Sequence, residues 1–260
     1  KPGGAMEVFQ DYAYYYNAFY KDKDYKQEAK QVDEILKRYD SQIKEIMNLG
    51  CGTGRHDIEL DKLGYQCKGI DISPEMIETA KKNALSVNAN IDFEVADIRT
   101  YEEEKSYDAV ISLFHVMSYQ SQNIDVLNAL KTARKLLYDT GKSGYFLFDV
   151  WYGPGVLSDK PSVKVKEVED EKNRLIRIAR PVMYNEKNLV DVNYEIFIID
   201  KETKKVRMIQ EVHTMRFFFR PELELLLSEA GFELVDNLDC QTLEATDFTS
   251  WTSYFIAKAI

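Results

Sequence analysis

Three glycines at alternate positions lie in the stretch NLGCGTGRH, residues 48–56. The first two residues of this stretch are the end of the apolar run EIMNL, residues 45–49. Glycine lets a chain turn sharply, and it lets a ligand come close to the backbone. A glycine-rich turn between a strand and a helix also presents backbone N–H groups and the positive end of the helix dipole. The loop formed by Gly50, Gly52 and Gly54 therefore predicts a binding site for an anionic or polar ligand.

The spacing of this loop narrows the kind of ligand. A phosphate-binding P-loop needs the pattern GxxxxGK followed by Ser or Thr, which the chain does not contain. A dinucleotide site needs GxGxxG or GxGxxA, with a small residue at position 55, where Arg55 stands instead. The pattern GxGxG favours a ligand without a pyrophosphate.

Two acids follow at the ends of the next predicted strands. Asp71 lies in GIDIS, about twenty residues after the loop, where a carboxylate can accept hydrogen bonds from both ribose hydroxyls. Asp97, in EVADIRT, can accept one from an exocyclic amine such as that of adenine. Either acid alone would equally suit a helix cap or a turn. Together with the glycine loop, at one edge of a parallel sheet, they indicate a nucleoside site.

The elements that position these residues alternate between short apolar runs and helical patterns from about residue 45 to 150. The predicted strands are EIMNLG, CKGIDI, IDFEVAD, YDAVISLF and GYFLFDV, and the predicted helices cover 54–63, 74–87 and 123–138. Such alternation predicts a parallel sheet covered by helices on both faces. Ser73 followed by Pro74 is typical of a helix start.

The pattern changes after Gly155. Four β-rich segments separated by polar turns lie near 162–168, 174–183, 189–200 and 205–219. They predict antiparallel hairpins. The helical run RPELELLLSEAGF and two further strands, FELVDNL and TSYFIAKA, then complete the chain. We expect three parts: an N-terminal helical lid (7–39), an α/β domain (40–155 and 219–260) and an antiparallel β insertion (156–218) after the fifth strand.

These residues and motifs resemble those of the class I S-adenosylmethionine-dependent methyltransferases, over about 45–150 and 221–260. The resemblance implies a Rossmann-like, doubly wound sheet of seven strands, mostly parallel, with the last strand antiparallel. It implies that the glycine loop passes under the methionine part of the cofactor, and that the two acids bind its ribose and adenine. The implied cofactor-binding residues are Gly50, Cys51, Gly52, Gly54, Asp71, Ile72, Met76, Asp97, Ile98 and Leu113, with Asn48 where the family usually has an acid.

The methyl acceptor would lie in the same crevice, beside the residues that follow strands four and five in LFHVMSY and DVWYGPG. The candidates for contacting it are His115, Tyr119, Asp149, Trp151 and Tyr152. A hydrogen-bonded structural role is equally open for His115. For His213, in the insertion, the structural role is favoured, and His56 would either touch the cofactor or cap its helix.

The N-terminal arm DYAYYYNAFYKDKDY contains six tyrosines. Helical periodicity places four of its aromatic residues on one face, which would suit core packing: Tyr12, Tyr15, Tyr16 and Phe19. The arm also resembles the lid of methyltransferases that act on small amines, such as N,N-dimethyltransferases of nucleotide-linked amino sugars and glycine N-methyltransferases. By this resemblance, Tyr14 or Tyr15 would contact the acceptor, whereas Tyr20 and Tyr25 would close over the cofactor.

Composition excludes several classes of protein. Apolar residues make up 45% and charged residues 30% of the 260, and no apolar stretch approaches the about 18 residues of a membrane helix, so we expect a soluble protein without a membrane partner. The net charge of -10 argues against nucleic acid as a partner. Three cysteines without a CxxC pair, and an N-terminal KPGGAM without a signal-peptide core, predict no disulfide framework, no metal site and a cytoplasmic location.

Methyl transfer is an in-line displacement in which an enzyme mainly aligns the reactants and excludes water. A neutral amine attacks without a base but must first lose any extra proton, whereas a hydroxyl needs a general base. His115 is the first candidate base and Asp149 the second. We expect N-methylation of a small polar amine, with a nucleotide-linked amino sugar as one case. The alternatives are O- or C-methylation of a small aromatic or lipid-like acceptor, and a non-catalytic S-adenosylmethionine-binding protein. The insertion would shape the acceptor pocket, form a homodimer interface, or do both.

Overall fold

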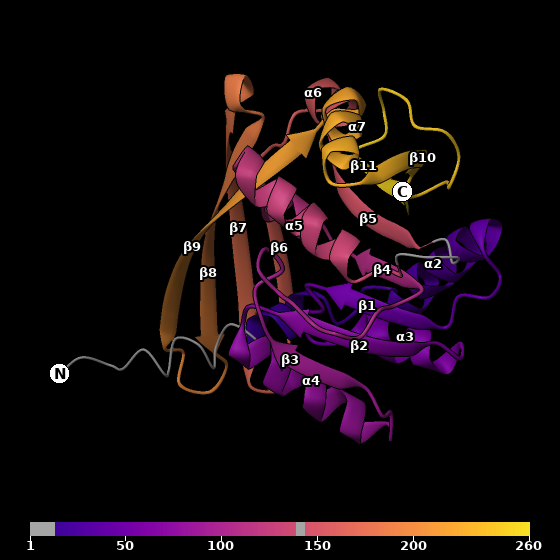
Figure 1. The fold of residues 1–260 in the computed structure, drawn as a ribbon. Coiled ribbons are helices and arrows are strands. Elements are labelled where there is room, and N and C mark those ends of the chain that lie inside the picture. Colours follow the sequence, from indigo (N-terminus) through magenta and orange to yellow (C-terminus); the bar gives the residue numbers. More distant parts are fainter. Residues whose placement is uncertain (1–13, 139–143) are drawn as a thin grey trace.

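A computed structural model describes residues 14–138 and 144–260. Its centre is a parallel sheet in the order β3-β2-β1-β4-β5, extended beyond β5 by β11 and β10 (Figure 1). The seven strands are β1 (Glu45–Leu49), β2 (Gln66–Asp71), β3 (Asp92–Val95), β4 (Ala109–Ser112), β5 (Tyr145–Tyr152), β10 (Phe232–Asp239) and β11 (Thr252–Ala259). Because β11 runs antiparallel to both β5 and β10, the predicted mostly parallel sheet with an antiparallel last strand is confirmed.

Helices cover both faces of this sheet. They are α2 (Tyr25–Tyr39), α3 (Arg55–Lys62), α4 (Pro74–Ser86), α5 (Asn123–Lys135), α6 (Gly153–Ser158) and α7 (Arg220–Glu229), with short 3-10 turns η1 (Val116–Tyr119) and η2 (Asn185–Lys187). Alternate residues of the buried strand β5 pack into different cores, because successive side chains point to opposite faces. Phe146 and Phe148 pack on the side of α5 and α7, whereas Leu147 packs on the side of α2.

The insertion is an antiparallel meander of four strands. They are β6 (Lys164–Glu169), β7 (Asn173–Tyr184), β8 (Leu189–Asp200) and β9 (Val206–Phe218), close to the predicted segments. The last residues of β9 pair in parallel with the end of β5, Phe217 with Trp151 and Phe218 with Tyr152. The insertion and the α/β core therefore form one continuous sheet of eleven strands, although Figure 1 shows the meander standing to one side.

The described part of the N-terminal arm lies against the insertion. Residues 14–19 are helical, and Tyr15 and Phe19 are buried against Leu175, Ile196 and Ile198. The expectation for Tyr12 and for the rest of 7–13 lies outside the described residues. In the two described ranges, none of the helices combines the length and apolarity that a membrane crossing requires.

Candidate active site

The glycine loop after β1 turns through three left-handed residues. The φ angles of Gly50, Gly52 and Gly54 are 83°, 55° and 71°, values that residues other than glycine rarely adopt. A Cβ added at Gly50 would lie 2.6 Å from the Val116 side chain, whereas one at Gly52 would meet nothing within 4 Å. The loop therefore packs tightly at its start and faces open space at Gly52, where a ligand can reach the backbone.

Asp71 is tied to this loop from the end of β2. Its Oδ2 accepts a hydrogen bond from the Gly52 N–H at 2.9 Å, and its Oδ1 accepts one from the Ser73 N–H at 2.9 Å. Burial raises the pKa of the Asp71 carboxyl, while these backbone N–H groups act to lower it. The neighbouring Ile72 is 66% exposed. An anchored carboxylate and an exposed apolar side chain thus stand side by side at the loop.

Asp97 is held by a residue that the sequence interpretation did not select. The Arg99 Nε lies 3.0 Å from Asp97 Oδ1, and the Arg99 Nη2 lies 2.6 Å from Oδ2. These hydrogen bonds lower the pKa of the Asp97 carboxyl. Arg99 also reaches Asp125 at 3.1 Å. The only signal available in the sequence was the arginine two positions after the acid, which by itself suits a surface ion pair.

The other predicted cofactor residues are more buried. Asn48 is 1% exposed, and its Nδ2 donates to Asp57 Oδ2 at 2.9 Å. Burial raises the pKa of Asp57 to about 6, against the opposing effect of that hydrogen bond. Cys51, Ile98 and Leu113 each belong to an apolar cluster of the core, and Met76 is 5% exposed. Asn48 therefore anchors the base of α3, and its role toward a ligand stays a prediction.

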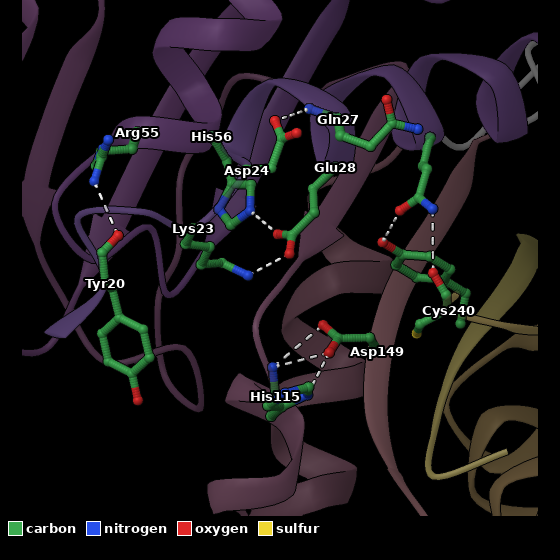
Figure 2. Close-up of polar contacts among 12 residues, drawn as sticks. Tyr20, Lys23, Asp24, Gln27, Glu28, Arg55, His56, His115, Asp149 and Cys240 are labelled. Atoms are coloured by element: carbon green, nitrogen blue, oxygen red, sulfur yellow. Dashed lines mark hydrogen bonds and ion pairs between the residues drawn. The ribbon is translucent and has the colours of Figure 1, made fainter. Parts of the chain in front are cut away.

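The helix that begins at the glycine loop also holds the N-terminal arm. The guanidinium of Arg55 lies 4.3 Å from the centre of the Tyr25 ring, and its Nη1 donates to the Tyr20 carbonyl at 3.3 Å. His56 packs edge-on against Tyr25, and its Nε2 lies 2.5 Å from Glu28 Oε2 (Figure 2). His56 is thus buried between loop and arm, a role that sequence reasoning missed because Glu28 lies 28 residues away.

Lys23 completes this ionic cluster by pairing with the other oxygen of Glu28. Burial alone would raise the pKa of Glu28, but the hydrogen bond and charge of His56, together with Lys23, outweigh it and lower the pKa to about 2. The Lys23 ammonium also lies 4.0 Å from the centre of the Phe114 ring, which packs edge-on to Tyr20. Glu28 is therefore ionised at neutral pH and links the arm to the glycine-loop helix.

His115 and Asp149 meet beside this cluster. The His115 backbone N–H donates to both carboxylate oxygens of Asp149, at 3.2 and 3.1 Å, and the Nδ1 of its ring lies 2.5 Å from Oδ2 (Figure 2). His115 has a φ of 67°, and Phe114 before it has a φ of 63°. This left-handed turn at the end of β4 brings the ring and the backbone N–H of one residue onto the same buried carboxylate.

A cavity of about 210 Å³ opens at this point. Its lining comes from the arm, α2, the ends of β4 and β5, the loop after β10 and the start of β11: Lys23, Glu28, Gln31, Leu113, Phe114, His115, Asp149, Cys240, Gln241, Thr252 and Tyr254. Pockets for whole ligands usually measure about 300–1,000 Å³, so this one has room for part of a ligand. His115, Asp149 and Leu113 lie together at this cavity, and their contacts with cofactor and acceptor stay predictions.

The predicted acceptor contacts divide into two groups. The hydroxyl of Tyr119, at the end of η1, forms a hydrogen bond of 2.7 Å with His213 Nδ1. The backbone N–H of Trp151 donates to Ser118 Oγ at 2.9 Å. Tyr152 instead lies on the opposite face of β5 from Asp149, in the apolar core. Tyr14 donates to Asp170 in the turn after β6. Among the described residues, His115 and Asp149 are the predicted acceptor contacts that line the cavity. The others do not line it, so their contact with an acceptor stays a prediction: Tyr14, Tyr15, Tyr119, Trp151 and Tyr152.

Comparison with known proteins agrees with this arrangement. The family described as Methyltransferase domain matches residues 46–141, which contain the glycine loop, Asp71, Asp97 and His115. The chain belongs to the class I S-adenosylmethionine-dependent methyltransferases. It is 22% identical over 226 residues to dTDP-3-amino-3,4,6-trideoxy-alpha-D-glucopyranose N,N-dimethyltransferase of Streptomyces venezuelae, covering 86% of this chain and 91% of that one.

Solved methyltransferases share the whole fold, insertion included. An S-adenosylmethionine-dependent methyltransferase of Clostridium acetobutylicum superposes with a TM-score of 0.81 at 18% identity, over 97% of this chain and 99% of that chain. A sugar N-methyltransferase of Streptoalloteichus superposes with a TM-score of 0.77 at 19% identity, over 98% and 94%.

The residues of this methyltransferase fit S-adenosylmethionine. The open face at Gly52 leaves the backbone accessible, and the exposed Ile72 side chain offers an apolar surface to a flat ring. Asp71 adds a carboxylate fixed beside both. These three features match the polar and apolar parts of a nucleoside.

Proposed function

We propose that this methyltransferase methylates an amine nitrogen of a small polar metabolite, with nucleotide-linked amino sugars as the leading substrate class. The observation that carries the proposal is the cavity that His115 and Asp149 line together with Lys23 of the arm and Glu28 of α2. Glu28 is in turn bound to His56, on the helix that begins at the glycine loop. The net charge of -10 disfavours a nucleic acid acceptor. The relative from Streptomyces venezuelae, named as an amino-sugar N,N-dimethyltransferase, supports the substrate class.

The proposed cofactor contacts follow from the site. The glycine loop would hold the methionine part, and Asp71 the ribose hydroxyls. Asp97, already neutralised by Arg99, would accept a hydrogen bond from the adenine amine beside Ile72. When bound, S-adenosylmethionine supplies a methyl group on a positively charged sulfur.

His115 and Asp149 would prepare the acceptor. The Asp149 carboxylate lies 2.5 Å from His115 Nδ1, although not in line for a hydrogen bond, and its charge favours a proton on that nitrogen. Nε2 would then be the accepting nitrogen of a neutral ring. An acceptor that enters as an ammonium ion can then give a proton to Nε2 and regain the lone pair with which it attacks. The buried Asp149 stabilises the imidazolium that results. Around them, Phe114 and Tyr254 exclude water from the cavity.

The test combines binding with an acceptor screen. Calorimetry should show S-adenosylmethionine binding that Asp71→Ala weakens, because the loop then loses the carboxylate that accepts from Gly52. A screen of nucleotide-linked amino sugars, glycine and other small amines, followed by mass spectrometry, should give a methylated amine. His115→Ala should then lower kcat by about 10²-fold or more at saturating substrates.

Three results would each contradict part of the proposal. Unchanged cofactor binding in Asp71→Ala would remove the ribose contact. Methylation only of phenols, carbon acids or lipid-like acceptors would replace N-methylation by O- or C-methylation. Unchanged turnover in His115→Ala would remove the proposed base while leaving the substrate class intact.

A further inference from the structure

A second histidine–carboxylate pair lies outside the cavity and ends on a tyrosine. The Tyr119 hydroxyl lies 2.7 Å from His213 Nδ1, and His213 Nε2 lies 3.0 Å from Glu211 Oε2. Tyr15, on the helical segment of the arm, donates to the other oxygen of Glu211. Four side chains from η1, β9 and the arm thus form one hydrogen-bonded chain.

The chemistry of these groups fixes the direction of each hydrogen bond. An ionised carboxylate only accepts, so His213 Nε2 must donate to Glu211. The other nitrogen of a neutral imidazole then accepts, so the Tyr119 O–H donates to Nδ1. A hydroxyl that donates to a histidine backed by a carboxylate is the arrangement that activates nucleophiles in catalytic triads.

Packing shields the pair and leaves the tyrosine accessible. The side chains of His213 and Glu211 are 19% and 23% exposed, whereas Tyr119 is 47% exposed. The titratable groups that face His213 are Tyr119 from η1, Tyr194 from β8, whose ring lies edge-on at 5.0 Å, and Glu211 from its own strand. His115 caps the start of η1 and Tyr119 is its last residue, so the two histidine pairs lie at the two ends of one short turn.

We propose that Tyr119 is a catalytic proton acceptor for the methyl acceptor, with His213 and Glu211 as positioning residues that take up the charge. This inference rests on the proposed N-methylation. A nitrogen that enters as an ammonium ion gives up one proton before it attacks. It must give up a second before it leaves as a neutral amine or accepts another methyl group. Two proton acceptors therefore suit this reaction, and η1 joins a histidine pair at each of its ends.

The proton balance of the second step is simple. After the nitrogen lone pair has formed the N–C bond and the C–S bond has broken, with its electron pair left on sulfur, the nitrogen carries a positive charge. Its proton moves to the Tyr119 oxygen as the hydroxyl proton moves to His213 Nδ1. Glu211 stabilises the imidazolium until His213 releases a proton to water.

The first measurement needs no acceptor. The chain contains three histidines, so a spectrum of ¹⁵N-histidine-labelled protein contains three imidazoles, each assignable from a single His→Gln variant. We expect neutral His213 to carry its proton on Nε2, and its Nδ1 signal to shift in Tyr119→Phe. A proton on Nδ1 would overturn the relay, whatever the substrate proves to be.

The second measurement uses the amine found in the screen. Tyr119→Phe should lower kcat by about 10²-fold while leaving the Kd for S-adenosylmethionine unchanged. Glu211→Gln should move the acidic limb of the kcat profile to lower pH, because the His213 imidazolium loses its carboxylate. Tyr184→Phe, at a tyrosine of similar exposure (42%) at the end of β7, is the matched control and should behave as wild type.

The two proposals fail in different ways. Normal kcat and an unmoved pH profile in Tyr119→Phe and Glu211→Gln would overturn the relay while amine methylation stands. Failure of every amine in the screen would overturn the proposed function, and the relay with it, even if the labelled spectrum shows the expected hydrogen-bond direction.

Discussion

The two histidine–carboxylate pairs at the ends of η1 differ in what holds their carboxylates. Asp149 lies in the parallel core with 6% of its side chain exposed, and it accepts hydrogen bonds from the backbone of the residue that it orients. Glu211 lies in the meander with 23% exposed, and it accepts from Tyr15 of the arm. The first pair is thus buried within the core of the fold. The position of the Glu211 carboxylate in the second pair depends in part on the hydrogen bond from Tyr15 of the arm.

The largest expected difference concerns stability. Asp149→Asn should lower the free energy of unfolding by about 2–3 kcal/mol, because a buried charged acceptor and its contacts to His115 are lost. Glu211→Gln should lower it by less than about 1 kcal/mol, since its side chain is 23% exposed and water partly replaces the lost interaction. Urea unfolding at pH 7 measures both. Equal losses would show that burial does not distinguish the two pairs.

The third histidine pair gives a pH test of the arm. The pKa of Glu28 is lowered from 4.5 to about 2 in the folded protein, so its contribution to stability is present above pH 4.5 and is lost as the pH falls toward 2. Glu28→Gln should remove about 1–2 kcal/mol at pH 7 and flatten the stability profile between pH 4.5 and 2. Glu34→Gln, at an exposed position of the same helix, serves as the control. An unchanged profile in Glu28→Gln would contradict the ionic cluster.

The smallest effect concerns salt. In double-mutant cycles under mildly acidic conditions, where histidines are protonated, the coupling energy of His213 with Glu211 should fall by about 0.3–0.5 kcal/mol when ionic strength rises from about 0.05 to 0.5 M, because salt screens partly exposed charges. The coupling of His115 with Asp149 should change less. Thermal or urea unfolding of the single and double variants at both salt concentrations measures this, and the opposite order would reverse the comparison.

Much of the fold was predictable because its signals are local. Alternating apolar runs and helical patterns predicted the parallel sheet. The β-rich segments separated by polar turns after Gly155 predicted the meander. The parallel pairing of Phe217 with Trp151 was not predictable, because neither residue carries a signal for a partner 66 positions away. The continuous sheet therefore emerged only from the structure.

The site was predictable in the same unequal way. Glycine spacing and strand-end acids indicated the loop, Asp71 and Asp97. The partners of the histidines lie far along the chain, His56 with Glu28 and His213 with Tyr119, and sequence reasoning favoured a structural His213. Which residues the histidines contact depends on how the arm and the insertion pack, and no local sequence pattern predicts that packing.

One strand, β9, has a mechanical consequence. Its thirteen residues run without interruption from the meander into the core sheet, so the two parts are joined by a continuous strand and not by a flexible hinge. Moving the meander away from the core would break backbone hydrogen bonds between β9 and its neighbours β5 and β8. Residues 14–24 of the arm are held mainly by side chains, and they can detach at lower cost. We therefore expect that opening the site costs less by moving the arm than by moving the meander.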